Sequence, residues 1–234
     1  MFNQKIQDWF IKNKWEPHSY QLELFKKIDE INNALILAPT GSGKTLAGFL
    51  PSINEMIVNP KQGLNTLYIS PLKALANDIE RNLSKPIKEM GLNIRLETRT
   101  GDTKQSKKNK QKYNPPNFLM TTPESFILML SWESASIFFK NLRYLIIDEI
   151  HTLVNDKRGD LLSLGISRLC HINKKIKKIG LSATVSEPNL ILNWLNSGNQ
   201  SNVKSSIIKQ EWLLNPEIKL PKTKKQIPWS GHSG

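Results

Sequence analysis

The chain has 234 residues and a single cysteine, Cys170, so it cannot form an internal disulfide framework. This usage is typical of a reducing compartment, and Cys170 itself is predicted to be a small core residue. The four histidines show no spacing typical of a metal site. No apolar run approaches the ~20 residues of a membrane span, and residues 1–15 lack the apolar core of a signal peptide. These absences predict a cytoplasmic or nucleoid-associated protein without a membrane partner.

Acidic residues are scarce, with 20 Asp and Glu against 33 Lys and Arg, which gives a formal charge of +13. Positive charge favours a polyanionic partner, because neutralising phosphates releases counterions. The alternative is that a Lys- and Asn-rich composition follows genome base content and that its Lys runs are solvated surface. The basic stretch Gln105–Lys112 is predicted to be a solvated helix or loop rather than a specific site.

Short apolar segments alternate with amphipathic ones along the chain. The predicted strands are Ala34–Leu37, Thr66–Ile69, Ile94–Glu97, Phe118–Met120, Tyr144–Ile147, Lys178–Leu181 and, at an edge, Ser206–Ile208. Near-continuous apolar strands are buried on both faces, which is typical of a parallel sheet covered by helices. The pattern predicts an α/β fold with a mainly parallel sheet of about seven strands and helices on both faces.

Helical spacing of apolar residues marks the segments between the strands. Asp160 is the predicted cap of a helix that runs through Leu169. Pro51 lies within the helix expected after Thr45 and is predicted to bend it. The stretch Leu213–Gly234 has three prolines with lysines between them and resembles a linker, so the domain itself is predicted over residues 1–212.

A glycine-rich loop, Ala38–Thr45 (Ala-Pro-Thr-Gly-Ser-Gly-Lys-Thr), follows the first strand and opens a helix. Gly41 and Gly43 let backbone N–H groups turn inward toward phosphate oxygens, and the helix N-terminus adds its positive dipole end. In this context the pattern predicts a nucleoside triphosphate site in which Lys44 reaches the β- and γ-phosphates and the Thr45 hydroxyl holds Mg²⁺. The phosphate-loop pattern G-x-x-x-x-G-K-[ST] begins with Gly, where this chain has Ala38. Alanine is small enough to be tolerated at that position.

A second motif, Asp148-Glu149-Ile150-His151, follows the strand that ends at Ile147. Adjacent carboxylates at the end of a parallel strand face the same crevice as the phosphate loop. Asp148 is predicted to hold Mg²⁺ and Glu149 to polarise the water that attacks the γ-phosphate. After the next strand, Ser182-Ala183-Thr184 is expected to bond to His151 or Glu149 and to sense the γ-phosphate.

Taken in order, these motifs resemble those of a superfamily-2 helicase. Gln21 resembles the Q motif, whose amide tests the adenine edge, and the loops at Ser70–Leu75, Thr98–Asp102 and Thr121–Ser125 resemble motifs Ia, Ib and Ic. The resemblance implies a RecA-like P-loop domain that binds ATP and Mg²⁺. It implies nucleotide contacts from Gln21, Pro39, Thr40, Gly41, Ser42, Gly43, Lys44 and Thr45, catalysis by Lys44, Glu149 and His151, and backbone contacts to nucleic acid from Pro71, Lys73, Arg99, Thr100, Gly101, Thr122 and Pro123.

The greatest likeness is to the large-helicase-related (Lhr) group, especially its bacterial ligase-associated DExH-box branch. Strings such as Thr45–Pro51, Tyr68–Ala76, Lys157–Asp160 and Gly180–Val185 carry it. The likeness implies an ATP-driven 3′-to-5′ helicase or translocase that acts on DNA or DNA–RNA hybrids in repair. It also implies a second RecA-like domain as partner, in cis or as a split protein, because the 234 residues hold only the first.

Two further functions remain open from the residues. One is an ATP-gated nucleic-acid-binding module without motor output, which the absence of a second domain favours for the isolated chain. The other is a P-loop small-molecule kinase, which is disfavoured because kinases lack the ordered set of Gln21, Asp-Glu-Ile-His and Ser-Ala-Thr. Phosphate contacts carry no sequence information, so binding to nucleic acid is expected to be non-specific and steeply salt-dependent.

Overall fold

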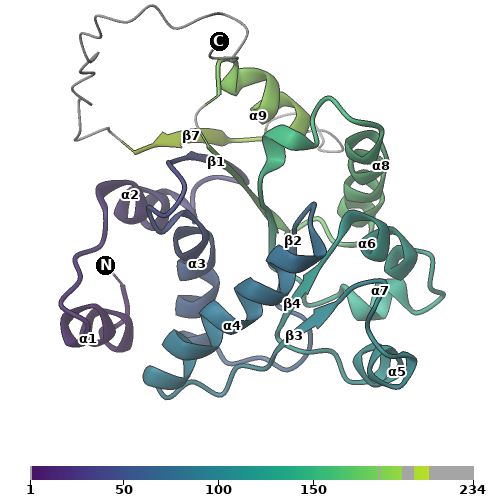
Figure 1. The fold of residues 1–234 in the computed structure, drawn as a ribbon, viewed down its shortest axis with the longest axis horizontal. Helices are drawn as coiled ribbons and strands as arrows, with labels where there is room; N and C mark the ends of the chain where they lie inside the picture. The colour runs from purple at the N-terminus through teal and green to yellow at the C-terminus, as the bar shows by residue number, and fades with distance from the viewer. Residues whose placement is uncertain (1, 184, 197–202, 211–234) are drawn as a thin grey trace, which may run out of the picture.

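A computed structural model of the chain describes residues 2–183, 185–196 and 203–210. Its centre is a seven-stranded sheet in the order β3-β4-β2-β5-β6-β1-β7, in which every neighbouring pair is parallel (Figure 1). The strands are β1 (Asn33–Leu37), β2 (Thr66–Ile69), β3 (Leu96–Arg99), β4 (Phe118–Thr121), β5 (Tyr144–Ile147), β6 (Lys177–Ser182) and β7 (Ser205–Lys209). The predicted α/β, RecA-like class is confirmed.

Helices connect consecutive strands, as parallel pairing requires. They are α1 (Gln4–Lys12), α2 (Ser19–Lys27), α3 (Lys44–Val58), α4 (Lys73–Glu89), α5 (Gln105–Tyr113), α6 (Pro123–Leu130), α7 (Ala135–Phe138), the 3₁₀ turn η1 (Ile150–Thr152), α8 (Lys157–Ile172) and α9 (Pro188–Asn196). Within these described residues no helix is long and apolar enough to cross a bilayer, and no three potential metal-ligating side chains gather.

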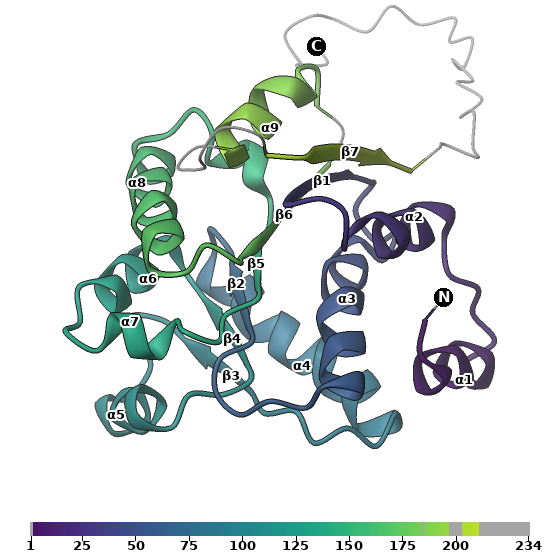
Figure 2. The same ribbon diagram turned by 180° about the vertical axis from the view of Figure 1, so that it is seen from behind.

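Two apolar clusters sandwich the sheet, because successive residues of a strand point to opposite faces. Ala34 and Ile36 of β1 pack into the cluster formed with α1 to α4, whereas Leu35 and Leu37 pack into the cluster formed with α6 to α9. The two helical layers lie on opposite sides of the sheet when it is seen from the front and from behind (Figures 1 and 2). Cys170, predicted in the core, is partly buried against the second cluster.

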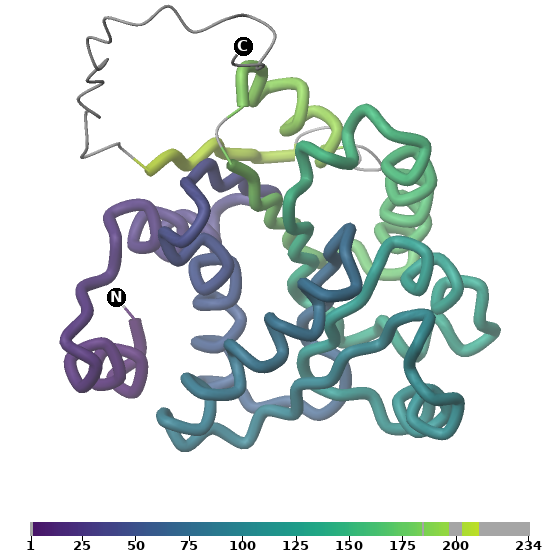
Figure 3. Tube along the Cα trace, in the orientation of Figure 1, coloured from purple at the N-terminus to yellow at the C-terminus, as the bar shows by residue number. Residues whose placement is uncertain are grey.

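The N-terminal helix packs beside a helix that lies far from it in sequence (Figure 3). Trp9 of α1 donates from Nε1 to Glu89 Oε2 of α4 at 2.7 Å. Trp9 and Trp15 also meet edge to face, with ring centroids 5.5 Å apart. The α1 segment is therefore anchored to the first helical layer by an indole hydrogen bond as well as by apolar contact.

Two predictions of where an element begins are wrong. The strand predicted at Ile94–Glu97 begins two residues later, at Leu96, because Leu96 is the first residue to pair with β4. The cap predicted at Asp160 is wrong as well: α8 starts one turn earlier, with Asp156 in the N-cap position and Asp160 inside the first turn. Both carboxylates suit a helix start, and sequence alone does not choose between them.

Two other predictions, the bend at Pro51 and the C-terminal linker, are not tested by the structure. Pro51 lies inside α3, where the predicted bend is untested, and the linker predicted at residues 213–234 lies outside the described residues. What matters for function is the parallel arrangement. Because all seven strands run the same way, every loop after a strand reaches one edge of the sheet, where ligands bind in open α/β folds.

Candidate functional site

The glycine-rich loop joins the end of β1 to the start of α3. Gly41 and Gly43 both have φ of +80°, a left-handed conformation that glycine adopts without steric cost. The Tyr20 hydroxyl donates to the Ser42 carbonyl at 2.7 Å, and Gln21 Nε2 donates to the Gly43 carbonyl at 3.2 Å. Helix α2 therefore holds the loop in shape, and the loop leads into the N-terminus of α3, a place that suits an anion.

Lys44, the first residue of α3, carries the main charge of this loop. Its side chain is only 6% exposed, and Nζ has no hydrogen-bond partner among the described residues. The nearest carboxylate oxygen, Glu149 Oε1, lies 3.5 Å away. A buried ammonium without hydrogen bonds is costly, so this position is arranged for an anionic ligand.

Asp148 is buried where β5 ends, next to a tyrosine that the sequence did not single out. The Tyr68 hydroxyl of β2 donates to Asp148 Oδ2, and the Glu149 N–H donates to Oδ1 at 2.9 Å. Burial raises the pKa of Asp148 above its ordinary value, against the lowering effect of the Tyr68 hydrogen bond. Burial, together with the Asp148 charge, also raises the pKa of Tyr68, so the phenol stays a hydrogen-bond donor.

Glu149 occupies an unusual backbone conformation, with φ of +47° in a non-glycine residue. Such strain of about 1–3 kcal/mol is typical of functional sites, where it aims a side chain. The carboxylate lies between two nitrogen groups: Oε1 is 3.5 Å from Lys44 Nζ, and Oε2 is 3.5 Å from His151 Nδ1. Ser182 Oγ lies 2.9 Å from the same His151 nitrogen.

Strand β6 explains how Ser182, His151 and Glu149 come to lie together. β6 lies between β1 and β5, so Ser182 ends a strand that separates the glycine loop from the acidic pair. β6 pairs directly with β5, and the contact expected between Ser182 and His151 is confirmed. Ala183 follows at the same edge, and Thr184 lies outside the described residues.

Gln21, the predicted adenine reader, is buried in the first turn of α2. Its Oε1 accepts from the His18 N–H at 2.9 Å, while Nε2 donates to the Gly43 carbonyl. An amide keeps one further N–H and one further lone pair beyond these two bonds. Gln21 thus shapes the phosphate loop directly, and its contact with adenine stays a prediction.

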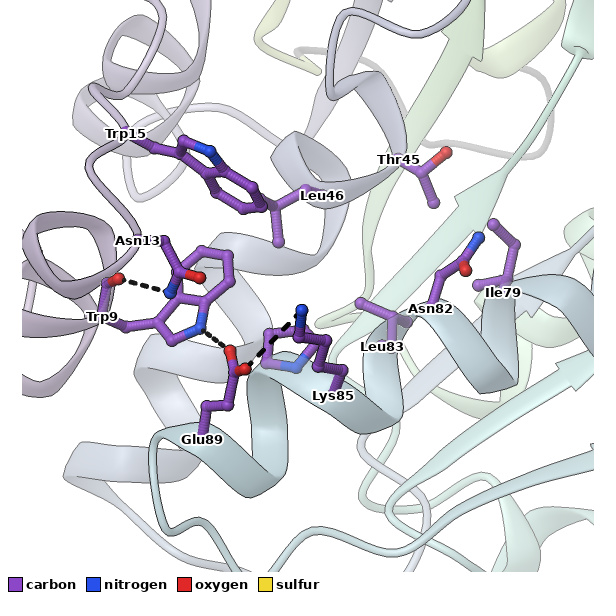
Figure 4. A pocket seen from close by; sticks show the side chains of 11 residues that line it. Trp9, Asn13, Trp15, Thr45, Leu46, Ile79, Asn82, Leu83, Lys85 and Glu89 are labelled. Carbon is purple, nitrogen blue, oxygen red and sulfur yellow. Dashed lines mark hydrogen bonds and ion pairs between the residues drawn. The ribbon is translucent and has the colours of Figure 1, made fainter.

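Thr45, the predicted magnesium ligand of α3, stands at one end of an apolar groove of about 230 Å³ (Figure 4). The groove is lined by Trp9 and Trp15 from the N-terminal segment and by Leu46 and Leu83 from α3 and α4. The Thr45 hydroxyl points away from the two tryptophans. It is therefore not part of the apolar surface of the groove.

The loops after β2, β4 and β3 form the other half of the same sheet edge. Lys73, at the start of α4, pairs with Asp102 beyond β3, with Nζ 2.9 and 3.0 Å from the two carboxylate oxygens. Gly101 lies beside this pair, since a Cβ placed there would stand 3.6 Å from Lys73 Nζ. The loops resembling motifs Ia and Ib are therefore in direct contact.

Not every predicted nucleic-acid residue faces the edge. The Arg99 guanidinium donates to the Lys108 carbonyl at 2.9 Å and lies 4.7 Å from the centroid of the Trp132 ring, which leaves Arg99 only 9% exposed. Thr100 and Thr122 are buried as well. These side chains shape the loops from within, and their contacts with nucleic acid stay predictions.

The remaining predicted residues surround the start of α6. Pro123 is the first helical residue, and Thr122 holds the N-cap position without a side-chain cap, its hydroxyl 3.3 Å from Ser125 Oγ. Pro71 follows β2, and its carbonyl accepts a bond from Arg158 at 2.9 Å. Sequence reasoning had noted Arg158 only as part of a family string, because nothing in the sequence indicates which loops it joins.

The sequence profile of the DEAD/DEAH box helicase family matches residues 18–191. The chain is 43% identical over 199 residues to the ATP-dependent helicase Lhr-Core of Methanocaldococcus jannaschii, covering 77% of this chain and 23% of that protein. It is 36% identical over 205 residues to the Lhr helicase/uracil glycosylase of Escherichia coli, covering 79% of this chain and 13% of that protein. The chain thus spans about a quarter or less of these relatives.

Among solved structures, the fold resembles that of Mycobacterium smegmatis helicase Lhr bound to ssDNA and AMP-PNP, with a TM-score of 0.80 and 37% identity. That similarity covers 89% of this chain and 28% of the other. Since the family profile takes in most of the chain, from the Q-motif region to α9, the protein belongs to the DEAD/DEAH box helicase family.

Proposed function

We propose that this chain is the ATP-binding motor domain of an ATP-dependent helicase or translocase, with DNA or a DNA–RNA hybrid as its track and DNA repair at the nucleoid as its setting. The observation that carries the proposal is the buried Lys44 ammonium, which has no hydrogen-bond partner in the described part of the chain and lies 3.5 Å from the Glu149 carboxylate. A triphosphate supplies the missing acceptors, and the glycine loop supplies N–H donors.

Thr45 and Asp148 fit the role of magnesium ligands, since one is a hydroxyl beside the phosphate loop and the other a buried carboxylate at the end of β5. Bound Mg²⁺ neutralises charge that develops on the phosphates. The Tyr68 hydroxyl and the Glu149 N–H hold the Asp148 carboxylate in place for this task.

Glu149 is the residue for accepting the proton of the attacking water. Its two oxygens are flanked by Lys44 and His151, and the strained backbone keeps the carboxylate at the edge of the sheet. His151, held against Ser182 Oγ, connects this carboxylate to the end of β6. General-base assistance of this type is worth roughly 10²–10⁴ in rate.

The nucleic-acid track runs, in this proposal, over the loops after β2, β4 and β3. Pro71, Lys73, Gly101 and Pro123 lie there beside helix N-termini, which suit phosphate contacts without sequence preference. The relative from Mycobacterium smegmatis, described with ssDNA and AMP-PNP, supports single-stranded DNA as the ligand.

A second RecA-like domain is the proposed partner, in cis or as a separate chain. It contributes the other wall of the ATP cleft and an arginine finger, whose loss typically costs ~10³–10⁵ in turnover. The 234 residues alone are therefore expected to bind Mg·ATP weakly, to hydrolyse it slowly and not to unwind a duplex.

The second candidate is an ATP-gated nucleic-acid-binding module without motor activity. The test is the ATPase rate with and without single-stranded DNA, measured for this chain and for a version that continues into the following domain. Stimulation by DNA in the longer version alone supports the motor. No stimulation in either version favours the binding module, and strand separation by these 234 residues alone would contradict the proposed need for a second domain.

A further inference from the structure

The loops after β2, β4 and β3 form the track half of the sheet edge. Arg158, near the start of α8, joins two of these loops. Its Nε donates to Glu124 Oε1 at 2.7 Å, and its Nη2 donates to the Pro71 carbonyl at 2.9 Å. Glu124 belongs to the first turn of α6 after β4, and Pro71 follows β2. One planar guanidinium therefore fixes the spacing between two loops that come from neighbouring strands.

The chain between the acidic pair and Arg158 is a continuous series of hydrogen-bonded turns. The Thr152 N–H and hydroxyl both donate to the Glu149 carbonyl, at 2.9 and 2.8 Å. The Leu153 N–H then donates to the Ile150 carbonyl at 3.0 Å, and the Asp156 N–H to the Leu153 carbonyl at 3.1 Å. The segment from Glu149 to Asp156 is therefore held by successive hydrogen bonds rather than being an irregular loop.

Gly159 ties the first turn of α8 to this series of turns. A Cβ at Gly159 would lie 1.8 Å from the Leu153 carbonyl oxygen, so the two backbones are in close contact. The Gly159 N–H also donates to the Asp156 carbonyl at 2.8 Å. Arg158, the preceding residue, is therefore placed directly beside the segment that begins at Glu149.

We propose that Arg158 is a positioning residue that couples nucleotide binding at Glu149 to the geometry of the track loops at Pro71 and Glu124. The inference rests on the proposed function and assigns it a connection between its two halves. A γ-phosphate near Lys44 and Glu149 shifts the turns from Ile150 to Asp156, and Arg158 carries that shift to both loops.

The exposure of the ion pair supports a geometric role over a stabilising one. The Arg158 and Glu124 side chains are 40% and 53% exposed, and ion pairs this exposed add little to folding stability. Although partial burial alone would raise the pKa of Glu124, the hydrogen bond from Arg158 leaves that pKa below its ordinary value. The pair therefore stays charged at neutral pH.

The experiment measures amide hydrogen exchange in peptides covering residues 70–76 and 121–128, with and without Mg·AMP-PNP. In the native chain, nucleotide is expected to change exchange in both segments by about 2- to 30-fold, the range typical of coupling between sites. The Arg158→Ala variant is expected to lose this response while its nucleotide Kd stays within roughly twofold of the native value. Arg158→Lys reaches only one of the two acceptors and should restore the response in one segment.

Arg168→Ala is the matched control, because Arg168 lies exposed on the same helix away from both loops. It should respond like the native chain. If Arg158→Ala melts before it can be measured, Glu124→Ala breaks one arm of the contact and should silence residues 121–128 only.

A full nucleotide response in Arg158→Ala, or no response in the native chain once nucleotide is bound, would overturn the coupling role. Failure of the native chain to bind Mg·AMP-PNP at all would instead overturn the proposed function, and calorimetry distinguishes the two outcomes.

Discussion

The two halves of the sheet edge differ in how their charged side chains are buried and paired. At the ends of β1, β6 and β5, charged groups are buried: among the residues that the structure describes, Lys44 Nζ has no hydrogen-bond partner, and Asp148 is almost inaccessible. At the ends of β2, β4 and β3, charges are either exposed and paired, as in Lys73 and Asp102, or turned inward, as in Arg99.

The difference shows what each ligand requires. A small, highly charged ligand is recognised by a few preorganised groups in a poorly hydrated place, where electrostatic interactions are strong. A long polyanion is followed by backbone N–H groups, hydroxyls and a few exposed cations, each contributing little. Single substitutions should therefore have large effects in the first half and small effects in the second.

The largest expected effect is on hydrolysis. Glu149→Gln keeps the size of the side chain and a carbonyl oxygen near Lys44, but it removes the proton acceptor. Single-turnover hydrolysis by this chain, or by the version with its following domain, should fall by roughly 10²–10⁴. Nucleotide affinity should remain close to native. Asp102→Asn makes the same chemical change in the track half and should leave hydrolysis intact, whereas equal losses in both variants would contradict the division of the edge.

The next effect is on nucleotide affinity. Lys44→Ala removes a buried cation that has no hydrogen-bond partner within the described ranges, and Mg·ATP affinity should fall by about 10²-fold or more, as for a buried charged contact. Calorimetric titration measures it. Lys73→Ala is the matched variant at the start of α4; it should leave Mg·ATP affinity unchanged and lower the salt slope of single-strand binding by about one.

The close backbone contact between Gly159 and Leu153 lies in the segment between the acidic pair and Arg158. The stability of the fold should be sensitive to a side chain added at Gly159. Gly159→Ala places a methyl 1.8 Å from the rigid Leu153 carbonyl, so the free energy of unfolding should fall by about 1–3 kcal/mol. Gly165→Ala, on the same helix, meets the flexible end of Ile127 at 2.4 Å and should cost less. Denaturant melts of both variants give the order, and a Gly165→Ala variant that is the less stable one would argue against a rigid turn at Leu153.

The smallest effect is a gain in stability. Burial raises the pKa of Asp148, so the folded chain holds its proton to higher pH than the unfolded chain does. Stability is then lost as pH rises above the ordinary value of 3.8, and it stays lower once the carboxyl has ionised in the folded state. Asp148→Asn should therefore melt at a higher temperature than the native chain at pH 7, with a smaller difference near pH 4. A variant that melts lower at pH 7 would show that the ionised carboxylate stabilises the fold.

Sequence was sufficient for the elements and insufficient for their contacts. The five inner strands were predictable because each is a short, fully buried and mostly apolar run, whereas the edge strand β3 is half-polar and its start was misplaced. The order of the strands was not predictable, and without it the pairing of Tyr68 with Asp148, 80 positions apart, has no sequence signal. The start of α8 failed for a related reason, since Asp156 and Asp160 are both good helix-start residues and the close contact at Gly159 decides between them.

The same division applies to the candidate site. The glycine loop and the acidic pair are local motifs at strand ends, so their meeting followed from parallel strands alone. Arg99 and Arg158 show the limit: both are basic residues at the edge of a motif, yet one turns toward Trp132 and the other bridges two loops. Direction of a long side chain depends on neighbours that only the fold supplies.

The most direct test of the account is the affinity for ATP, measured with and without Mg²⁺. It should be measured in the native chain, Lys44→Ala, Asp148→Asn and the double variant. If the loop after β1 and the carboxylate after β5 hold one magnesium-bound triphosphate, Mg²⁺ should strengthen binding in the native chain and not in Asp148→Asn. The double variant should then lose less than the sum of the single losses in binding free energy. Additive losses, or unchanged Mg²⁺ dependence in Asp148→Asn, would contradict a single shared site.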